Sequence, residues 1–452
     1  MSNNYYKFMH LKYNKKLLKG EGIMNRRILL LSLFMAGMAI ISWIPGSSAA
    51  EVGLEQQVQE LIRQNQFLTD RLKQVEQQLS EMKAKTMPAE VERRVSQIEE
   101  KLEKKTPATG FLSDLENRIT INGLLEFGGA YQSVDRKREG HKQDSDICLT
   151  TAQIGISAEV NDWVNGEMVL LYEDATFGEE TSVDIDEAFI TLGNTEKFPF
   201  FFKGGKMYVP YGSLLEHFPD DPLIDVPMTL TMGETSEKAV LIGAEYKGFA
   251  VSGYVFNGDV EEAGGDGDNV VESYGLDANY AFEDEDSGLD FLVGGSYISN
   301  VFEADGLTDA LDGLGADIAD YVGGTAAYFH VGYKGLFFDA EYMAATDNAE
   351  LCIERSFDVT DVGKVENMEV WNVEVGYNYN WWRNLEIAIK YAGSNDCEYF
   401  GFPKDRYGIN FNQEIFDNTI LSFGYLYDEY DKSDVEDRDS RDLFFSQIAI
   451  EF

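Results

Sequence analysis

Cysteine, proline and basic residues are scarce in this 452-residue sequence, and each shortage narrows the class of protein. The three cysteines, Cys148, Cys352 and Cys397, form no CxxC pair and lie far from the four histidines, so we expect neither a zinc site nor a bound cofactor. Lys and Arg number 37 against 80 Asp and Glu, and the resulting net charge of −43 repels nucleic acid and favours cations. Only nine prolines accompany 13% aromatic residues, a composition that disfavours disorder.

Long apolar runs are missing after residue 50, so any later membrane crossing must use strands. Before that point, Arg26-Arg27 precede an apolar run that ends at Pro45-Gly46, and small residues at 48–50 offer a cleavage site. This order predicts a secretory signal peptide within 1–50, with Met24 as its start and an upstream extension before it. An uncleaved anchor is the alternative, because the run is near the short limit of ~17 residues for a spanning helix.

Residues 51–105 have helical periodicity, with apolar residues at two positions of each heptad. Asn65 occupies one of these positions, where a single polar residue can fix register and strand number. We predict a periplasmic coiled coil over 51–105, a linker over 106–118 and a homotrimer; a lone amphipathic helix packed on a globular core is the alternative. The two seams hold Leu54, Leu61, Leu68, Val75 and Met82, and Val58, Asn65, Leu72 and Leu79.

From residue 119 to 452 a period of two replaces the helical period. Apolar and aromatic residues face one side of nearly every segment and acids face the other, which favours a lipid-facing wall around a wet lumen over a soluble multi-sheet protein. We therefore predict an all-β transmembrane barrel of about 16 antiparallel strands. The segments are 119–132, 146–160, 163–174, 183–193, 199–209, 239–247, 249–257, 271–282, 289–300, 321–333, 336–346, 369–380, 384–393, 405–413, 418–429 and 441–452.

The connections between these segments alternate between short and long, as in barrels with periplasmic turns and long external loops. The longest, the third external loop at about 210–238, holds three of the nine prolines, and loops of this length tend to be functional. Our hypothesis is that it enters the lumen and makes an acidic, cation-selective constriction; a solvated surface loop is the alternative. Its acids are Glu216, Asp220, Asp221, Asp225 and Glu234.

Strand parity assigns further charged residues to the lumen, where acids outnumber bases. Residues 119–452 carry 19 basic and 66 acidic residues, although acids in loops can also serve to hydrate them or to bind divalent ions among surface lipids. Cys352 and Cys397 fall in adjacent external loops and can form a disulfide, which leaves Cys148 free. The lumen-facing residues predicted are Glu126, Glu159, Glu167, Glu187, Asp277, Asp339, Glu341, Glu374 and Lys390, with Lys203 or Lys206 as another base.

Three segments resemble the LbtU-type siderophore porins of Gram-negative outer membranes. They are residues 186–192 (DEAFITL), residues 205–212 (GKMYVPYG) entering the third loop, and the terminal IAIEF of 448–452, which is similar to the signal read by the barrel-assembly machinery. The resemblance extends over nearly the whole chain after the signal peptide. It implies outer-membrane lipid as the surrounding medium and uptake of ferric siderophores without a plug domain, since plugged receptors need 22 strands.

No nucleophile elbow, phosphate loop, HExxH or paired-carboxylate motif stands out, so we do not expect an enzyme. The expected function is an outer-membrane porin with an acidic, cation-preferring channel for a ferric siderophore or another small solute. A general or phosphate-type porin is the alternative within transport. A structural tether that holds the outer membrane through the coiled coil is the alternative of another class.

Overall fold

A computed structural model describes residues 118–452, except for 175, 178–182, 215–226, 261, 264–269, 356–358, 380–382 and 432–436. The predicted signal peptide, coiled coil and linker lie outside the described residues. Sixteen strands form one sheet. They are β1 (Ile119–Arg136), β2 (Gly140–Asn161), β3 (Val164–Glu173), β4 (Asp184–Gly193), β5 (Phe200–Tyr208), β6 (Ser236–Tyr246), β7 (Phe249–Phe256), β8 (Ser273–Asp284), β9 (Leu289–Ile298), β11 (Gly324–Tyr333), β12 (Leu336–Ala345), β15 (Glu369–Tyr379), β16 (Leu385–Asn395), β17 (Asp405–Phe416), β18 (Thr419–Glu429) and β19 (Arg438–Glu451).

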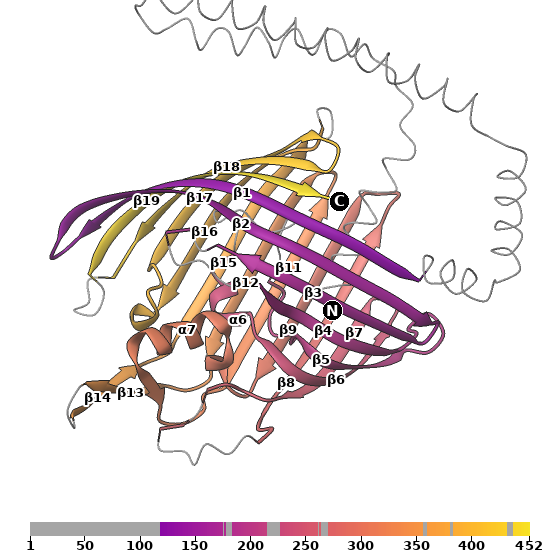
Figure 1. The fold of residues 1–452 in the computed structure, drawn as a ribbon, viewed down its shortest axis with the longest axis horizontal. Coiled ribbons are helices and arrows are strands. Elements are labelled where there is room, and N and C mark those ends of the chain that lie inside the picture. The colour runs from indigo at the N-terminus through magenta and orange to yellow at the C-terminus, as the bar shows by residue number, and fades with distance from the viewer. Residues whose placement is uncertain are drawn as a thin grey trace, which may run out of the picture. The chain divides into compact units, whose positions relative to one another are not determined.

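The sheet closes on itself (Figure 1). Each strand pairs antiparallel with its neighbours, and the first strand of the sheet, β1, pairs with both β2 and the last strand, β19. Closure leaves no strand edge unpaired, which is the condition for a sheet to cross lipid. The predicted barrel of sixteen antiparallel strands is confirmed.

The exposed outer positions of the strands are mainly aromatic and aliphatic, whereas the buried inner positions hold polar and charged residues together with small and some large apolar ones, such as Phe256 and Leu443. On β8, Tyr274 and Leu276 are 50% and 58% exposed, whereas Ser273 and Asp277 beside them are buried. A water-soluble sandwich would bury the apolar set, so this inverted pattern suits a wall surrounded by hydrocarbon. No helix among the described residues is long and apolar enough to cross a membrane.

Short turns join the strands at one end of the barrel. The turns at 247–248 and 334–335 pair a lysine with a glycine, and both residues of each have positive φ: 51° and 86° for Lys247 and Gly248, 50° and 93° for Lys334 and Gly335. Two consecutive positive φ angles are the signature of a type I′ turn, whose twist matches the strands. Gly248 also lies so close to β8 that an added Cβ would meet the Ala281 carbonyl oxygen at 2.2 Å.

Longer loops join the strands at the other end, called here the long-loop end. The loop expected at 133–145, between the first two predicted segments, was predicted wrongly. β1 continues to Arg136 and β2 begins at Gly140, so only residues 137–139 lie between them. The backbone ladder continues there although the side chains of both strands are polar apart from Val134, so the sequence loses its period of two while the strands persist.

The sequence did not predict any structure inside the long loops. They contain α6 (Leu230–Gly233), η1 (Val301–Glu303), α7 (Asp305–Leu314), η2 (Glu398–Phe400) and a small sheet of β10 (Ala316–Ile318), β13 (Ala349–Arg355) and β14 (Val359–Val365). Figure 1 shows α6, α7 and the β13–β14 hairpin together at one end of the barrel. Phe302, Leu307, Ile318 and Leu351 are fully buried in a shared apolar cluster, so these loops pack as a cap rather than as separate excursions.

Candidate functional site

The inner wall of the barrel carries most of the charged residues assigned to the lumen from the sequence. Six of them alternate along their strands with exposed apolar residues and are themselves 1–7% exposed. Glu167 and Glu187 are half-buried on β3 and β4, whereas Glu159 is exposed near the short-turn end of β2. The six are Glu126, Asp277, Asp339, Glu341, Glu374 and Lys390.

Strand register places several of these groups in one row across β11, β12, β15 and β16. His330 lies opposite Asp339, Asp339 opposite Glu374, and Glu374 opposite Lys390. The His330 ring contacts Asp339 through Nδ1 and Asp290 of β9 through Nε2 at 3.0 Å. Lys390 Nζ lies 3.6 Å from a Glu374 carboxylate oxygen. The row holds three carboxylates, those of Asp290, Asp339 and Glu374, against one lysine and one histidine, so it is a negative band on the inner wall.

Glu341 of β12 fastens the third loop (209–235) to this wall. Its Oε1 accepts hydrogen bonds from the Ser213 amide at 2.6 Å, the Ser213 hydroxyl at 3.2 Å and the Leu214 amide at 3.4 Å. Its Oε2 accepts one from the Thr229 hydroxyl at 2.6 Å. Both ends of the loop therefore meet one inward-facing carboxylate that lies more than a hundred residues away in the sequence.

Two further bonds fix the same loop against other strands of the inner wall. The Gly212 amide donates to the Ser296 hydroxyl of β9 at 2.7 Å, and the Met228 amide donates to Asn372 of β15 at 3.4 Å. An amide to hydroxyl or amide to carboxamide bond is directional, so together these contacts orient the two loop ends. The loop leaves the wall at β5 and returns to it at β6, yet it is held by β9, β12 and β15.

Of the five acids predicted at a constriction, only Glu234 is among the described residues. It is half-buried at the end of α6, where its carbonyl oxygen accepts a hydrogen bond from the Asp305 amide at 2.8 Å. Glu234 thus joins the third loop to α7 of the cap. Glu216, Asp220, Asp221 and Asp225 lie outside the described residues.

Two acids of the cap lie outside the barrel strands, of which Glu303 is buried and Asp305 is half-buried. Glu303 accepts hydrogen bonds from the Asp259 and Val260 amides at 2.9 and 3.3 Å, and burial raises its pKa against the effect of these bonds. Burial also raises the pKa of Asp305, at the first turn of α7, to about 6. The cap therefore contains two carboxyl groups whose charged form is disfavoured by burial.

Inward-facing arginines were missed in the sequence. Arg406 of β17 and Arg441 of β19 both bind Asp428 of β18, at 2.8 and 2.6 Å. Parity alone could have placed them, since they alternate with exposed Tyr407 and Phe444 as the acids do elsewhere. Of the lysines considered, Lys203 lies over the inward-facing Phe189 ring at 4.7 Å, whereas Lys206 lies 3.8 Å from Asp184, which is exposed.

The disulfide expected between Cys352 and Cys397 is not formed, and all three cysteines are free thiols. Cys352 is on β13, opposite Asp317 and Val362. The Cys397 thiol is buried and donates to the carbonyl oxygens of Asn395 at 3.1 Å and Glu369 at 3.5 Å, and burial raises its pKa to about 12. Cys352 lies in the small sheet formed within the loop at 346–368, whereas Cys397 lies at the start of η2, and sequence spacing could not indicate this arrangement.

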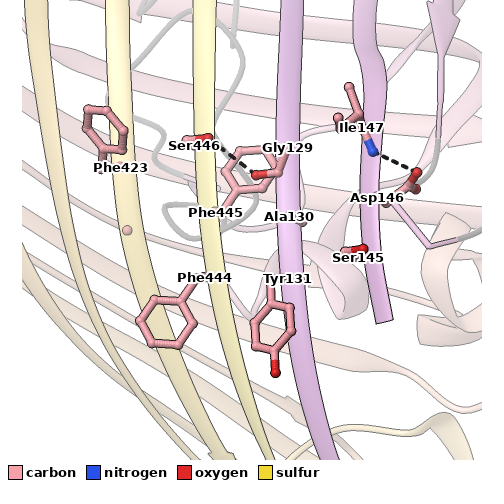
Figure 2. Close-up of a pocket in the computed structure, with 11 residues that line it drawn as sticks. Gly129, Ala130, Tyr131, Ser145, Asp146, Ile147, Phe423, Phe444, Phe445 and Ser446 are labelled. Atoms are coloured by element: carbon pink, nitrogen blue, oxygen red, sulfur yellow. Dashed lines mark hydrogen bonds between the residues drawn. The ribbon is translucent and has the colours of Figure 1, made fainter. Parts of the chain in front are cut away.

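A groove of about 790 Å³ lies on the outer face, where β1, β2, β18 and β19 meet (Figure 2). Its sides are the exposed rings of Tyr131, Phe423 and Phe444, and at its floor Ser446 Oγ donates to the Gly129 carbonyl oxygen at 3.4 Å. Small residues between aromatic ones leave a hollow in a wall that is otherwise apolar. This groove faces away from the lumen charges. No group of three or more His, Cys, Asp or Glu within the described ranges is placed to hold a metal ion.

No family model matches the chain. Among curated proteins, a UPF0422 protein of Coxiella burnetii is 25% identical over 340 residues, which is 73% of this chain and 68% of that protein. The UPF0422 protein lpl2888 of Legionella pneumophila strain Lens is 23% identical over 69% of this chain, and the match spans only 59% of its own length.

Among solved structures, the anion-selective porin from Comamonas acidovorans matches with a TM-score of 0.50 and 11% identity, over 74% of this chain and 99% of that one. The OmpF of Salmonella typhi in complex with daunomycin matches with a TM-score of 0.48 and 16% identity, over 74% and 97%. At 11% identity the likeness to the Comamonas porin shows the fold alone, that of a porin barrel.

Proposed function

We propose that this protein is an outer-membrane porin whose acidic lumen prefers cations. The observation that carries the proposal is the inside-out strand pattern: Glu126, Asp277 and Glu374 are shielded inside a closed wall whose outer face is aromatic and aliphatic. A closed sheet with an apolar exterior suits a bilayer, and a polar interior suits water and ions. Carboxylates that outnumber bases along the path attract cations and repel anions.

The third loop supports a narrowed channel. Its ends are hydrogen-bonded to Glu341, Ser296 and Asn372 on the inner wall, on strands other than β5 and β6, which the loop connects. A loop fixed there reduces the open section of the lumen. The four acids of the loop tip would then add to the negative band of Asp339 and Glu374 on the wall.

Reversal potentials in a KCl gradient test the proposal directly. Purified full-length protein in a planar bilayer should show discrete conductance steps and a reversal potential of the sign given by K⁺ passing more readily than Cl⁻. The preference should weaken at high salt, because the Debye length falls to ~3 Å at 1 M. A preference for Cl⁻ would refute the acidic lumen, and the absence of any conductance step would refute the channel.

A ferric siderophore is the solute that the LbtU-type resemblance suggests. A strain lacking the gene should lose uptake of iron from siderophore-containing medium and recover it with the plasmid-borne gene. A general or phosphate-type porin would leave iron uptake unchanged. The phosphate type is less well supported, because a ladder of lysines and arginines along the lumen is not seen among the described strands, where acids predominate.

The homotrimer and the periplasmic coiled coil are further parts of the proposal, and they rest on the heptads of residues 51–105. A tether built on that coiled coil would need no open lumen. Removing 51–105 separates the two functions. A porin keeps its single-channel conductance after this deletion, whereas a tether loses its attachment function and shows no conductance in either form.

A further inference from the structure

The inner wall is not uniformly acidic: basic residues gather at the long-loop ends of β1, β2, β17 and β19. Eight of the 19 basic residues of 119–452 lie at these ends or next to them. They are linked by register and by contacts, since Arg136 pairs opposite Arg438 and Lys137 donates to the Asp431 carbonyl oxygen at 3.0 Å. The eight are Arg136, Lys137, Arg138, Lys142, Lys404, Arg406, Arg438 and Arg441.

Strand register aligns the inward-facing members of this group in one row. Arg406 lies opposite Asp428, and Asp428 lies opposite Arg441. Arg406 binds the carboxylate through Nε and Nη2, at 2.8 and 3.2 Å, and Arg441 does so through Nε and Nη2 at 2.9 and 2.6 Å. These bonds fix both guanidinium planes and leave the Nη1 groups outside the carboxylate contact.

Exposure decides what this row presents to the lumen. The Asp428 side chain is 0% exposed, whereas those of Arg406 and Arg441 are 15% and 20% exposed. The carboxylate lies behind the two guanidinium groups, so a solute in the lumen meets the cations and not the anion. A carboxylate in this position orients the arginines without occupying their outer N–H groups.

A third guanidinium adds to the positive charge. Arg438 lies over the Tyr430 ring at 4.2 Å and donates to the Gly401 carbonyl oxygen at 2.9 Å. The Tyr430 hydroxyl in turn donates to Asp428 at 3.5 Å, so the ring joins Arg438 to the row. Arg136 and Arg138 lie 3.8 and 3.9 Å from Asp437. Even with Asp437 and exposed Asp439 counted beside Asp428, the five arginines of the group outnumber the three carboxylates.

The acids next in sequence to Arg406, Asp428 and Arg441 do not neutralise the row, because alternation turns them to the other face of the wall. Asp405 accepts a hydrogen bond from the Tyr391 hydroxyl at 2.8 Å. Asp442 and Glu429 accept hydrogen bonds from the hydroxyl groups of Tyr425 and Tyr427 in the same way. One face of three neighbouring strands is thus cationic and the opposite face anionic at the same level.

We propose that Arg406 and Arg441 form an oxyanion-binding site on the inner wall at the long-loop end, which holds a carboxylate or phosphate group of a solute. Fixed, paired guanidinium groups match the geometry of such oxygens. In a lumen that otherwise repels anions, the site would let an anionic group enter on one side while the acids of β8 to β15 attract cationic groups on the other. The site therefore suits a solute that carries both kinds of charge, or an anion complexed with a metal ion.

Calorimetric titration of the full-length protein in neutral detergent tests the site. Citrate and inorganic phosphate are the two probes, each compared with NaCl of equal ionic strength. Saturable binding of either probe is expected, and a rise in salt should weaken it. Arg406→Gln and Arg441→Gln should each weaken binding roughly tenfold or more, the effect of one charge-assisted hydrogen bond. Preference for citrate or for phosphate would identify which oxyanion the site takes.

Arg383→Gln is the matched control, because it removes the same charge from a short turn, where Arg383 pairs with Asp417 at 3.2 Å. It should bind the probes as the natural protein does. Equal binding by all three variants, or no saturable binding by the natural protein, would overturn the proposal. If the two arginine variants fail to fold, phenylglyoxal labelling of the natural protein decides: citrate should protect Arg406 and Arg441, and equal labelling with and without citrate would refute the site.

The inference rests on the proposed channel only in that water must reach the inner wall. Binding is measured without a membrane, so the two claims fail separately. A protein that conducts ions but binds neither probe keeps the porin function and loses this site. A protein that binds citrate through Arg406 and Arg441 but forms no channel keeps the site and loses the porin function.

Discussion

Glu341→Ala should release the third loop from the inner wall while leaving the barrel intact. The substitution removes four hydrogen bonds, from the Ser213 amide and hydroxyl, the Leu214 amide and the Thr229 hydroxyl. At roughly 1 kcal/mol net for each bond the loss is about 4 kcal/mol, which lowers the ratio of docked to released loop about a thousandfold. The barrel should persist, because the ladders of β12 with β11 and β15 use backbone groups.

Glu341→Gln should have a much smaller effect. The amide oxygen can keep the three bonds made by Oε1, and the Thr229 hydroxyl can turn to accept from the new NH₂ group. A cost of about 1 kcal/mol is expected, the value of one ordinary hydrogen bond. The two substitutions therefore separate the hydrogen bonding of the carboxylate from the presence of a side chain.

Limited proteolysis and single-channel recording report on the loop. In Glu341→Ala the segment 209–235 should become a cleavage site in detergent-folded protein, and conductance should rise or fluctuate between levels. Glu386→Ala is the matched control, since Glu386 is also a buried glutamate of the inner wall, bonded to Asn412 at 3.3 Å. If Glu341→Ala keeps a protected loop and the natural conductance, Glu341 does not hold the loop and the reasoning is wrong.

Three further predictions concern single groups. The pKa of Asp305 is about 6 in the folded protein, above its ordinary 3.8, so its contribution to stability is full below pH 3.8 and is lost as the pH rises through about 6. Thermal melts should show the long-loop cap weakening over this pH interval. Asp305→Asn should flatten this pH dependence. Lys390→Gln should shift the reversal potential toward cations and destabilise the protein by roughly 3–5 kcal/mol, because it leaves the buried Glu374 carboxylate without its lysine. Glu374→Gln should shift the potential the other way, and shifts of the same sign would contradict the placement of both side chains in the lumen. Cys397 should resist maleimide at neutral pH until the protein unfolds, and a mobility difference between reduced and unreduced samples on a gel would instead indicate a disulfide.

The strands and their inner and outer faces could be predicted because alternation is a local property. A residue such as Leu276 or Asp277 reveals its face through its immediate neighbours, and a closed wall requires the same inversion on all strands. The even strand count and the alternation of turn lengths add a constraint on the whole chain. For these reasons each of the sixteen segments corresponds to a strand of the wall, although β1 and β2 extend beyond the predicted ends, and Glu126, Glu341 and Lys390 are shielded on the strand face opposite the exposed apolar residues.

Local patterns failed where contacts are long-range. The long loops at 299–323 and 346–368 show no period in the sequence, and α7, β13 and β14 form there because Leu307, Ile318 and Leu351 pack in one buried cluster. The pairing of Cys352 with Cys397 was wrong for the same reason, since nearness in loop order is not nearness in a packed cap.

The amino-acid sequence by itself determined a barrel wall, its apolar exterior and its excess of inward acids, because each follows from period two and composition. Only the tertiary structure decided which charges meet. Ser213 reaches Glu341 across 128 residues of sequence, and Arg406 and Arg441 share Asp428 because the register of three strands brings them level. Register and loop packing come from closing the sheet on itself, and closure is a property of all the strands together.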